Sequence, residues 1–542
     1  MSRLPLDEVP PSIPSDADRS RKVLVMAIST RNAAALAGAC LASLMFGLEI
    51  SSVPVILPTL EAVLPADFKA LQWIMNAYTI ACTAVLMATG TLADRYGRKR
   101  LFVATTASFG VTSLICGLAP NAAILIAGRF LQGMAGGAML TCAVAIISHQ
   151  FPEGRERGRA FTIWGVVTGV GLGFGPVIGG LIASLAGWQW VFLVHVPLTV
   201  LALAPAAIGI RESRDPQAKT LDVAGIVTLT LAVFGFAYVI TQGAELGAAA
   251  ALGLAGLALA SFLAFLAVER RAAQPMFDFS VFRIRRFSGA IIGCIGMNFS
   301  YWPFIIYLPI YFQSGLGLGS EAAGLLLLAY TVPFMLMPSV SDHLLRRHGP
   351  QAVIPLGMLA MGAGFIAMWF GSSLVQASWA TLLPGALLAG IGLGLTNTAV
   401  TNTTTGSVPS SRSGMASSID ISARLIALAI NIAVMGLILV EGIRRSLPDA
   451  VSAAFDRLQL QALASSIAAG NLGSLREAYP ALALHDPSGA GAHAALVQGF
   501  GWVMLYGGVS AGVLAAISFL IFGGAKRQAL AGAAPACAQS DA

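Results

Sequence analysis

The stretch GTLADRYGRKR, residues 90–100, places five charged residues between two strongly apolar runs. The neighbouring runs, 71–91 and 101–119, are each about as long as a helix must be to cross the hydrocarbon core of a membrane. Only a short turn remains to join them, and the charged residues fill that turn. The stretch therefore predicts two membrane-spanning helices whose connecting loop lies on one surface of the membrane.

The rest of the chain repeats this pattern of apolar runs and links. Of its 542 residues, 56% are apolar and 11% are charged, whereas a soluble domain carries about a quarter charged residues. A membrane β-barrel would show short alternating segments instead of long apolar runs. We therefore expect an all-α integral membrane protein with fourteen transmembrane helices. The fourteen runs span residues 33–58, 71–91, 101–119, 122–148, 160–185, 190–210, 222–242, 249–268, 288–313, 322–340, 352–371, 379–403, 415–440 and 497–523.

The links between the runs alternate in charge. Links after every second run are basic, such as RYGRKR, PEGRERGR and DHLLRRHG, and most of the links between them carry few cations. Because basic links face the cytoplasm, we expect a multi-pass protein of the cytoplasmic or inner membrane with both termini inside. The net charge of +7 then belongs to cytoplasmic loops, and we expect no nucleic-acid partner.

Two terminal segments and one long link stand apart from the apolar runs. Residues 1–30 are polar and contain several prolines, which predicts a disordered cytoplasmic tail, and residues 526–542 are expected to form a second tail. The link 441–496 has mixed charge and falls on the outer side. Its apolar residues between Val451 and Ile467 have helical spacing, so we expect one or two short helices on the outer surface.

Residue types that would build an enzyme site or hold a metal are sparse. No CxxC spacing is present, and five of the six cysteines lie inside apolar runs, so we interpret them as packing residues. The six histidines are scattered and lie mostly in links, which argues against a catalytic cluster. No Walker motif is present, so ATP is not the direct energy source. We expect no enzymatic activity, no cofactor and no metal, with an ion gradient as the driving force.

The charged loop carries more than a topology signal. A basic anchor alone would explain Arg98, Lys99 and Arg100, but not the residues before them. Gly90 is expected to allow a close approach of helices, and Gly97 a tight turn. Asp94 lies four residues before Arg98, the spacing of a helical ion pair.

This loop resembles the signature of the major facilitator superfamily, and a weaker version, SDHLLRRHG at 341–349, follows the tenth run. A cue repeated in both halves fits the internal repeats of secondary transporters. The resemblance implies two six-helix bundles with two extra central helices, and a loop that acts as a cytoplasmic latch. The residues expected to act in gating are Gly90, Asp94, Arg95, Gly97, Arg98 and Asp342.

The stretch GVGLGFGPVIGG, residues 169–180, indicates which branch of the superfamily the chain resembles. Gly171, Gly175 and Gly179 have the spacing of close helix packing, and Pro176 adds a kink. The stretch, which also includes Gly180, is similar to the antiporter motif of drug:proton exporters. Other segments, such as WIMNAY (73–78) and WQWVFLVHVP (188–197), resemble the fourteen-span drug:proton antiporters.

That resemblance implies a domain organisation and a function. The expected units are tail 1–30, bundle 31–211, extra helices 212–271, bundle 272–525 with the outer loop 441–496, and tail 526–542. The expected function is proton-driven export of amphipathic or cationic drugs and toxic compounds. Export of one specific metabolite, such as a siderophore or lipid, and nutrient uptake are the alternatives.

Two ionisable residues lie deep inside apolar runs. Glu49 is near the middle of 33–58, and Arg129 lies inside 122–148. Such residues are costly in a membrane and mark functional sites by default. Low dielectric disfavours the charged form of a carboxyl group, so we expect Glu49 to bind and release a proton under the influence of Arg129. The alternative is a structural partnership without a cycling proton.

Asp420 is a third candidate for proton coupling. It lies four residues before Arg424, so the two side chains are either a mutually neutralising pair or part of a second titrating site. The family resemblance weakens here, because LIALAIN follows Arg424 where glycine pairs are expected.

A drug site in such a protein is an apolar and aromatic cavity with a few polar groups. Each candidate could instead face lipid or the interface. The residues expected to bind substrate are Trp73, Asn76, Tyr78, Asn298, Tyr301 and Trp302. The expected partners are a small-molecule substrate, protons and the lipid bilayer. We expect a monomer, with a periplasmic adaptor if the host is Gram-negative.

Overall fold

The computed structural model describes residues 30–533 except 65, 152–154, 215–221, 244–245, 273–278, 374–376, 409–412, 471 and 473–474. The predicted N-terminal tail and the end of the C-terminal tail lie outside the described residues. Within them the chain is helical and contains no strand. The predicted all-α membrane fold is confirmed.

The first half of the protein runs from Thr30 to Gly209. Side chains cap the starts of two of its helices. The Asp67 carboxylate accepts a hydrogen bond from the Ala70 amide at the start of Phe68–Tyr96, and the Asn121 side chain accepts one from the Ile124 amide at the start of Ala122–Gln150. Gly97 adopts a φ of 112° between two helices, which glycine allows without strain. The helices are α2 (Thr30–Val63), α3 (Phe68–Tyr96), α4 (Arg98–Gly117), α5 (Ala122–Gln150), α6 (Arg155–Ala186), α7 (Gln189–Leu193) and α8 (His195–Gly209).

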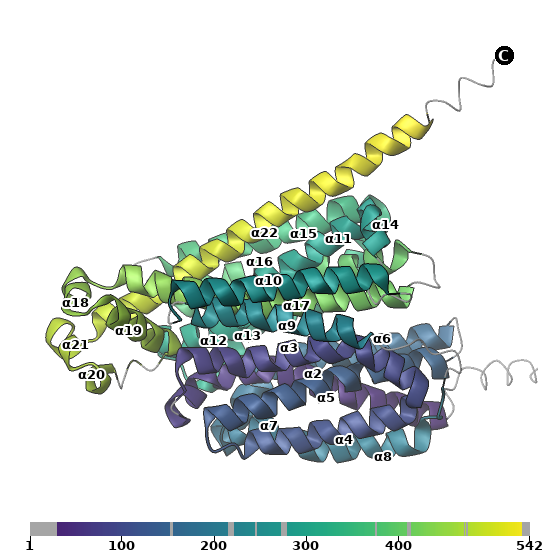
Figure 1. Cartoon of the computed structure of the whole chain (residues 1–542), viewed down its shortest axis with the longest axis horizontal. Coiled ribbons are helices and arrows are strands. Elements are labelled where there is room, and N and C mark those ends of the chain that lie inside the picture. Colours follow the sequence, from purple (N-terminus) through teal and green to yellow (C-terminus); the bar gives the residue numbers. More distant parts are fainter. Residues whose placement is uncertain are drawn as a thin grey trace, which may run out of the picture.

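The second half packs against the first as a separate layer, shown in teal to yellow in Figure 1. One of its spans is bent by 42° between α13 and α14, where Pro338 starts the second helix. The helices are α11 (Arg285–Phe299), α12 (Tyr301–Ile310), α13 (Ser320–Leu336), α14 (Pro338–His348), α15 (Pro350–Ser372), α16 (Trp379–Gly406), α17 (Ser413–Ser446) and α22 (Ala490–Ala533), with the short 3-10 helix η1 (Phe279–Arg283) and the short π-helix η2 (Tyr311–Gly315).

Two further helices, α9 (Val223–Gln242) and α10 (Ala248–Arg271), lie along the seam between the halves. Helix α9 contacts α3 of the first half and α17 of the second, while α10 packs on α9. Trp73 of α3 takes part in this packing, since its ring centre lies 5.3 Å from that of Phe234 on α9. The pair is thus attached to both halves.

The predicted count of fourteen spans is not confirmed. In the described part of the chain, 12 helices are long and apolar enough to cross a membrane, or up to 13 if the bent pair is one span. Each of the fourteen predicted runs is largely helical, although 190–210, 288–313 and 322–340 are each divided between successive helices. The run 71–91 forms α3, which is not among the candidate spans.

The two ends of the helical bundle differ. One, which we call the α19 end, carries α18 (Asp449–Ala454), α19 (Arg457–Ala469), α20 (Leu475–Ala478) and α21 (Pro480–His485) (Figure 1). Two of them, α18 and α19, lie in the stretch 449–470 where one or two short helices were expected, and Asp456 caps the second. Helices α20 and α21 follow outside that stretch. The opposite end, the Gly97 end, holds the Gly97 turn and the start of α2. Helix α22 continues to Ala533, past the predicted boundary at 525.

Candidate functional site

The glycine-rich stretch of α6 packs directly against α2. The hydroxyl of Ser51 donates a hydrogen bond to the Gly171 carbonyl, and that of Ser52 to the Gly175 carbonyl, both over 3.0 Å. A Cβ at Gly175 would lie 1.8 Å from Ser51 Oγ, and one at Gly179 would lie 2.7 Å from Ser52 Cβ. The backbones approach this closely because glycine removes the side chains that would separate them.

A second face of α6 contacts the other half of the protein. The Thr331 hydroxyl of α13 donates a 2.7 Å hydrogen bond to the Gly173 carbonyl. A Cβ at Gly180 would lie 2.6 Å from the Ser320 carbonyl oxygen, and one at Gly324 of α13 would lie 2.6 Å from the Pro176 carbonyl oxygen. The predicted antiporter motif therefore lies between α2 and α13, with glycines on both faces.

The Gly97 turn is held by a residue in the link that follows α8. The Glu212 carboxylate accepts hydrogen bonds from the backbone amides of Lys99 and Arg100, each over 3.2 Å. These are free amides at the start of α4, where the helix dipole favours negative charge. A Cβ at Gly97 would lie 2.5 Å from Glu212 Oε1. Sequence reasoning missed Glu212, because its link shows only a mixture of charges.

The other predicted gating residues lie apart from this contact. The close approach expected at Gly90 is wrong, because a Cβ there would face open space, with no atom within 4 Å. Arg98 extends toward the Ser213 hydroxyl at 3.5 Å, and Arg95 is exposed. Asp342 pairs with Arg346 of its own helix. The side chain of Asp94 lies outside the described residues.

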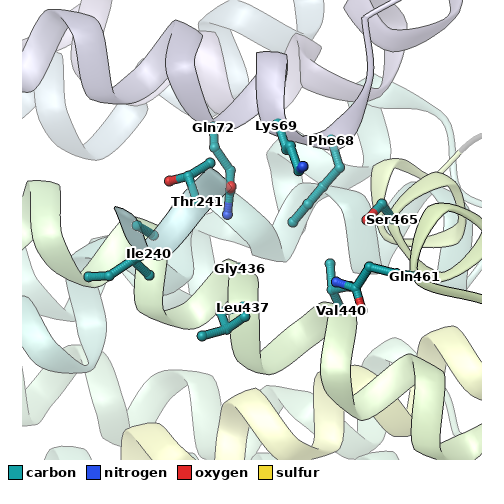
Figure 2. A pocket seen from close by; sticks show the side chains of 11 residues that line it. Phe68, Lys69, Gln72, Ile240, Thr241, Gly436, Leu437, Val440, Gln461 and Ser465 are labelled. Atoms are coloured by element: carbon teal, nitrogen blue, oxygen red, sulfur yellow. The ribbon is translucent and has the colours of Figure 1, made fainter. Parts of the chain in front are cut away.

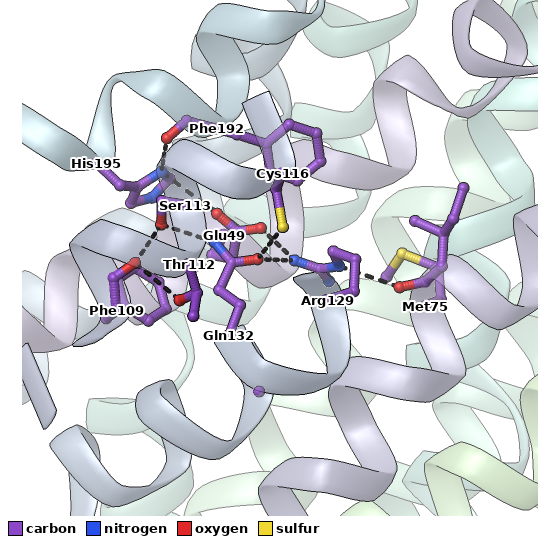
Figure 3. Close-up of polar contacts among 12 residues, drawn as sticks. Glu49, Met75, Phe109, Thr112, Ser113, Cys116, Arg129, Gln132, Phe192 and His195 are labelled. Atoms are coloured by element: carbon purple, nitrogen blue, oxygen red, sulfur yellow. Dashed lines mark hydrogen bonds and ion pairs between the residues drawn. The ribbon is translucent and has the colours of Figure 1, made fainter. Parts of the chain in front are cut away.

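A buried cluster of polar side chains surrounds Glu49 (Figure 3). The Arg129 guanidinium forms an ion pair with Glu49 Oε1, and both side chains are 0% exposed. Arg129 also donates to the Ile74 carbonyl (3.0 Å) and to the Gln132 side chain (2.9 Å), and Gln132 donates to Ser113 (2.8 Å). Three helices thus hold Arg129 in place, which a buried charge requires.

His195 completes this group, which we call the Glu49 cluster: Glu49, Arg129, Gln132, Ser113 and His195. Its Nδ1 lies 3.3 Å from Glu49 Oε2, and its ring is 1% exposed. Sequence analysis did not single out His195, whose ring at the start of α8 faces α2 and Glu49. The available signal was its place inside the run 190–210, since an ionisable residue at membrane depth marks a site by default.

Asp420 and Arg424 form the ion pair that their spacing predicts, over 3.0 Å. Arg424 also donates to the side chains of Asn397 and Thr401 on α16. The pair belongs to the second half, whereas the Glu49 cluster belongs to the first. Each half thus contains a carboxylate that is paired with an arginine.

A central pocket lies between the halves. Its lining is apolar and aromatic, and the residues come from α2, α3, α12 and α17: Ile50, Met75, Tyr78, Thr79, Cys82, Trp302, Ile305, Ile306, Leu425 and Leu428. Tyr78 also faces the Glu49 cluster, with Arg129 Cζ 4.2 Å from the centre of its ring. One aromatic side chain therefore contacts both the central pocket and the buried ion pair.

Of the six residues predicted to bind substrate, Tyr78 and Trp302 line this pocket. The other four have different surroundings. Trp73 packs on α9, and Asn298 donates to a carbonyl of its own helix. Tyr301 stacks on Tyr330 with ring centres 3.9 Å apart, and Asn76 is fully buried.

The halves also meet at the α19 end. The Gln72 side chain of α3 donates a 2.9 Å hydrogen bond to the Tyr307 hydroxyl, which itself donates to the Ile432 carbonyl. A Cβ at Gly436 of α17 would lie 1.5 Å from Gln72 Nε2. Beside this junction is a pocket with a mixed apolar and polar lining that reaches α19, where Gln461 and Ser465 contribute to its wall (Figure 2).

Relatives of the chain carry names of drug-resistance and export proteins. The chain is 29% identical over 426 residues to multidrug resistance protein Stp of Mycobacterium tuberculosis, covering 78% of this chain and 79% of that protein. It is 29% identical over 416 residues to the tetracenomycin C resistance and export protein of Streptomyces glaucescens, covering 75% and 76%.

The fold is shared with solved transporters. A bacterial homologue of the human lysosomal transporter Spinster superposes with a TM-score of 0.60 at 17% identity, covering 91% of this chain and 97% of that one. A sequence profile of the Major Facilitator Superfamily matches residues 39–431, which is most of the chain. The chain therefore belongs to the Major Facilitator Superfamily.

Proposed function

We propose that the protein is a proton-driven secondary exporter of amphipathic or cationic small molecules that works by alternating access. The observation that carries this proposal is the position of Tyr78, which lines the central pocket and covers Arg129 of the Glu49 cluster. A change of charge in the Glu49 cluster would therefore alter the electrostatic surroundings of Tyr78, a side chain that would contact the substrate.

The character of the central pocket supports the substrate class. Its lining is apolar, with the aromatic rings of Tyr78 and Trp302 at its edge. Aromatic faces attract organic cations by the ring quadrupole, and the apolar walls bind the rest of an amphipathic molecule. Names of the relatives point the same way, since they include multidrug resistance and drug export.

The contacts between the halves support a rocking motion. Gln72, Tyr307 and Gly436 close the α19 end, and we infer that they form the outer gate. Helix α6 contacts both α2 and α13 through glycines, so it can slide between them with few side chains in the way. Residues at the Gly97 turn would act on the inner side.

Orientation and assembly follow from the same proposal. The basic links support a cytoplasmic Gly97 end, so both termini would be cytoplasmic and the α19 end would face outward. We infer a monomeric carrier without catalytic activity in the cytoplasmic membrane. A periplasmic adaptor for a Gram-negative host stays a prediction.

Ethidium efflux from cells that lack their own major pumps tests the proposal. The wild type is expected to extrude ethidium, and a protonophore is expected to abolish the extrusion. Glu49→Gln is expected to lose efflux at normal expression, whereas Glu321→Gln on the exposed start of α13 keeps it. Efflux that persists in the presence of the protonophore would contradict the proton-driven mechanism. Well-folded wild type without efflux would instead favour a single specific substrate, to be sought among siderophores and lipids.

A further inference from the structure

His195 is a buried titratable residue in direct contact with the carboxylate that the proposed function requires. We propose that the exchanged proton resides on the His195 ring, with Glu49 as its fixed counter-ion. This inference rests on the proposed function and assigns the exchanged proton to His195 instead of Glu49.

The surroundings of the His195 ring consist of oxygen acceptors. Its Nδ1 lies 3.3 Å from the Phe192 carbonyl oxygen and 3.3 Å from Glu49 Oε2, and its Nε2 lies 3.2 Å from the Met45 carbonyl oxygen. A neutral imidazole has one N–H and one bare nitrogen, whereas the cation has two N–H groups. As long as the Glu49 carboxylate is ionised, a bare nitrogen in either neutral tautomer would face an oxygen with no hydrogen between them. The cationic ring removes this repulsion and donates on both sides.

The ion pair with Arg129 decides between Glu49 and His195 as the proton acceptor. Protonation of Glu49 would leave the fully buried Arg129 without a counter-ion, and an uncompensated buried charge is strongly destabilising. Protonation of His195 leaves the carboxylate ionised between two cations, with Oε1 toward Arg129 and Oε2 toward His195. The cluster gains one positive charge in either case, but only the second arrangement keeps each cation beside an anion.

Other titratable groups in the surroundings do not compete for this proton. The thiols and the phenol nearby already hold their protons near neutral pH. The titratable side chains that lie beside the cluster on the neighbouring helices are Tyr78 and Cys82 on α3 and Cys116 on α4.

The same arrangement explains how a cationic substrate would displace the proton. A cation in the central pocket beside Tyr78 adds positive charge close to Arg129. Repulsion then disfavours the His195 cation, which releases its proton and returns to the neutral ring. Release of the substrate allows the His195 ring to bind a proton again, so the substrate and the proton occupy the carrier in alternation.

Nitrogen-15 NMR of the histidine rings tests the protonation state without transport. Purified protein labelled at histidine is expected to show a doubly protonated His195 ring near neutral pH, assigned from the signal lost in His195→Gln or His195→Asn. Glu49→Gln is expected to convert that ring to a neutral one, because its counter-ion is removed. A singly protonated His195 in the wild type at every pH that supports transport would overturn the inference.

Transport in proteoliposomes tests the coupling, with tetraphenylphosphonium as the lipophilic cation. His195→Asn is expected to lose accumulation driven by a pH gradient while it keeps gradient-free exchange of labelled for unlabelled cation. His348→Asn, on the exposed end of α14, is the matched control and is expected to keep both. Gradient-driven accumulation by His195→Asn at the wild-type level would overturn the inference. Absence of gradient-driven accumulation in the wild type would instead overturn the proposed function.

Discussion

Gly175 of α6 and Ser51 of α2 are so close that a Cβ on the glycine would lie 1.8 Å from the serine Oγ. That hydroxyl is already engaged, because it donates to the carbonyls of Gly47 and Gly171. A side chain at Gly175 would therefore break two hydrogen bonds as well as separate the helices. The glycine-rich stretch of α6 forms here a surface from which side chains are excluded.

Gly179→Ala is expected to destabilise the protein by about 1–3 kcal/mol, the usual effect of overpacking. Its Cβ would lie 2.9 Å from Ser52 Cα, and the backbone cannot rotate away as a side chain can. Gly169→Ala on the same helix meets no atom within 4 Å and is the control. Thermal unfolding in detergent and ethidium efflux would be measured for both. Equal unfolding temperatures and equal efflux for the two variants would contradict a tight contact between α2 and α6 at Gly179.

Gly97→Ala is expected to cost about 1–3 kcal/mol, because an alanine is strained at a φ of 112°. Its Cβ also collides with the Glu212 carboxylate. Glu212→Ala removes that collision but loses the cap on α4, so the double variant should be less destabilised than the sum of the single variants. Unfolding free energies from a double-mutant cycle measure this coupling. Additive effects would contradict the Gly97–Glu212 contact.

Gly436→Ala is expected to slow efflux, because its Cβ would displace Gln72 and break the hydrogen bond from Gln72 to Tyr307. Adding Gln72→Ala should recover part of the efflux rate, since the small side chain leaves room for the methyl group. Gly256→Ala on α10, which meets no atom within 4 Å, serves as the control. Efflux by Gly436→Ala at the wild-type rate would argue against a gate at this junction.

Trp302→Ala is expected to weaken binding of a lipophilic cation, since loss of an aromatic face removes about 0.5–2 kcal/mol of attraction. Trp73→Ala should leave that affinity unchanged and lower the thermal stability, because Trp73 packs on Phe234 and Tyr238 of α9. Tetraphenylphosphonium binding and unfolding temperature would be measured for the same preparations. If Trp73→Ala weakened binding and Trp302→Ala did not, the substrate would instead bind beside α9.

Asp420→Asn is expected to destabilise the protein by about 1–3 kcal/mol, because Arg424 loses its counter-ion. The double variant Asp420→Asn/Arg424→Gln should be more stable than the single one and should keep gradient-driven efflux. Unfolding and efflux measured in parallel distinguish a structural pair from a second proton site. A properly folded double variant that has lost its proton dependence would assign Asp420 to coupling.

Patterns along a single helix are readable in the sequence alone. Hydropathy identifies the helices, because each apolar run has a length that suits a membrane. The i, i+4 spacing of Asp420 and Arg424 predicts their ion pair, since the pitch of a helix sets the distance between such residues. Glycines four residues apart in 169–180 predict a face suited to close packing, and that face packs against α2.

Contacts between helices cannot be derived in this way. Glu49 and His195, Gly97 and Glu212, and Gln72 and Gly436 are all far apart in the chain. Lipid is as apolar as the helix surfaces, so hydropathy does not say which face of a helix meets protein. Close packing and hydrogen bonding among the helices select their rotation and their neighbours.

By itself, the sequence determined the helical membrane fold, the superfamily resemblance and the burial of Glu49 and Arg129 within apolar runs, because these depend on local composition and spacing. Only the tertiary structure decided that His195 faces Glu49, that Glu212 caps α4, and that Tyr78 connects the Glu49 cluster to the central pocket. Those partnerships depend on how several helices pack together, which is a property of the whole bundle.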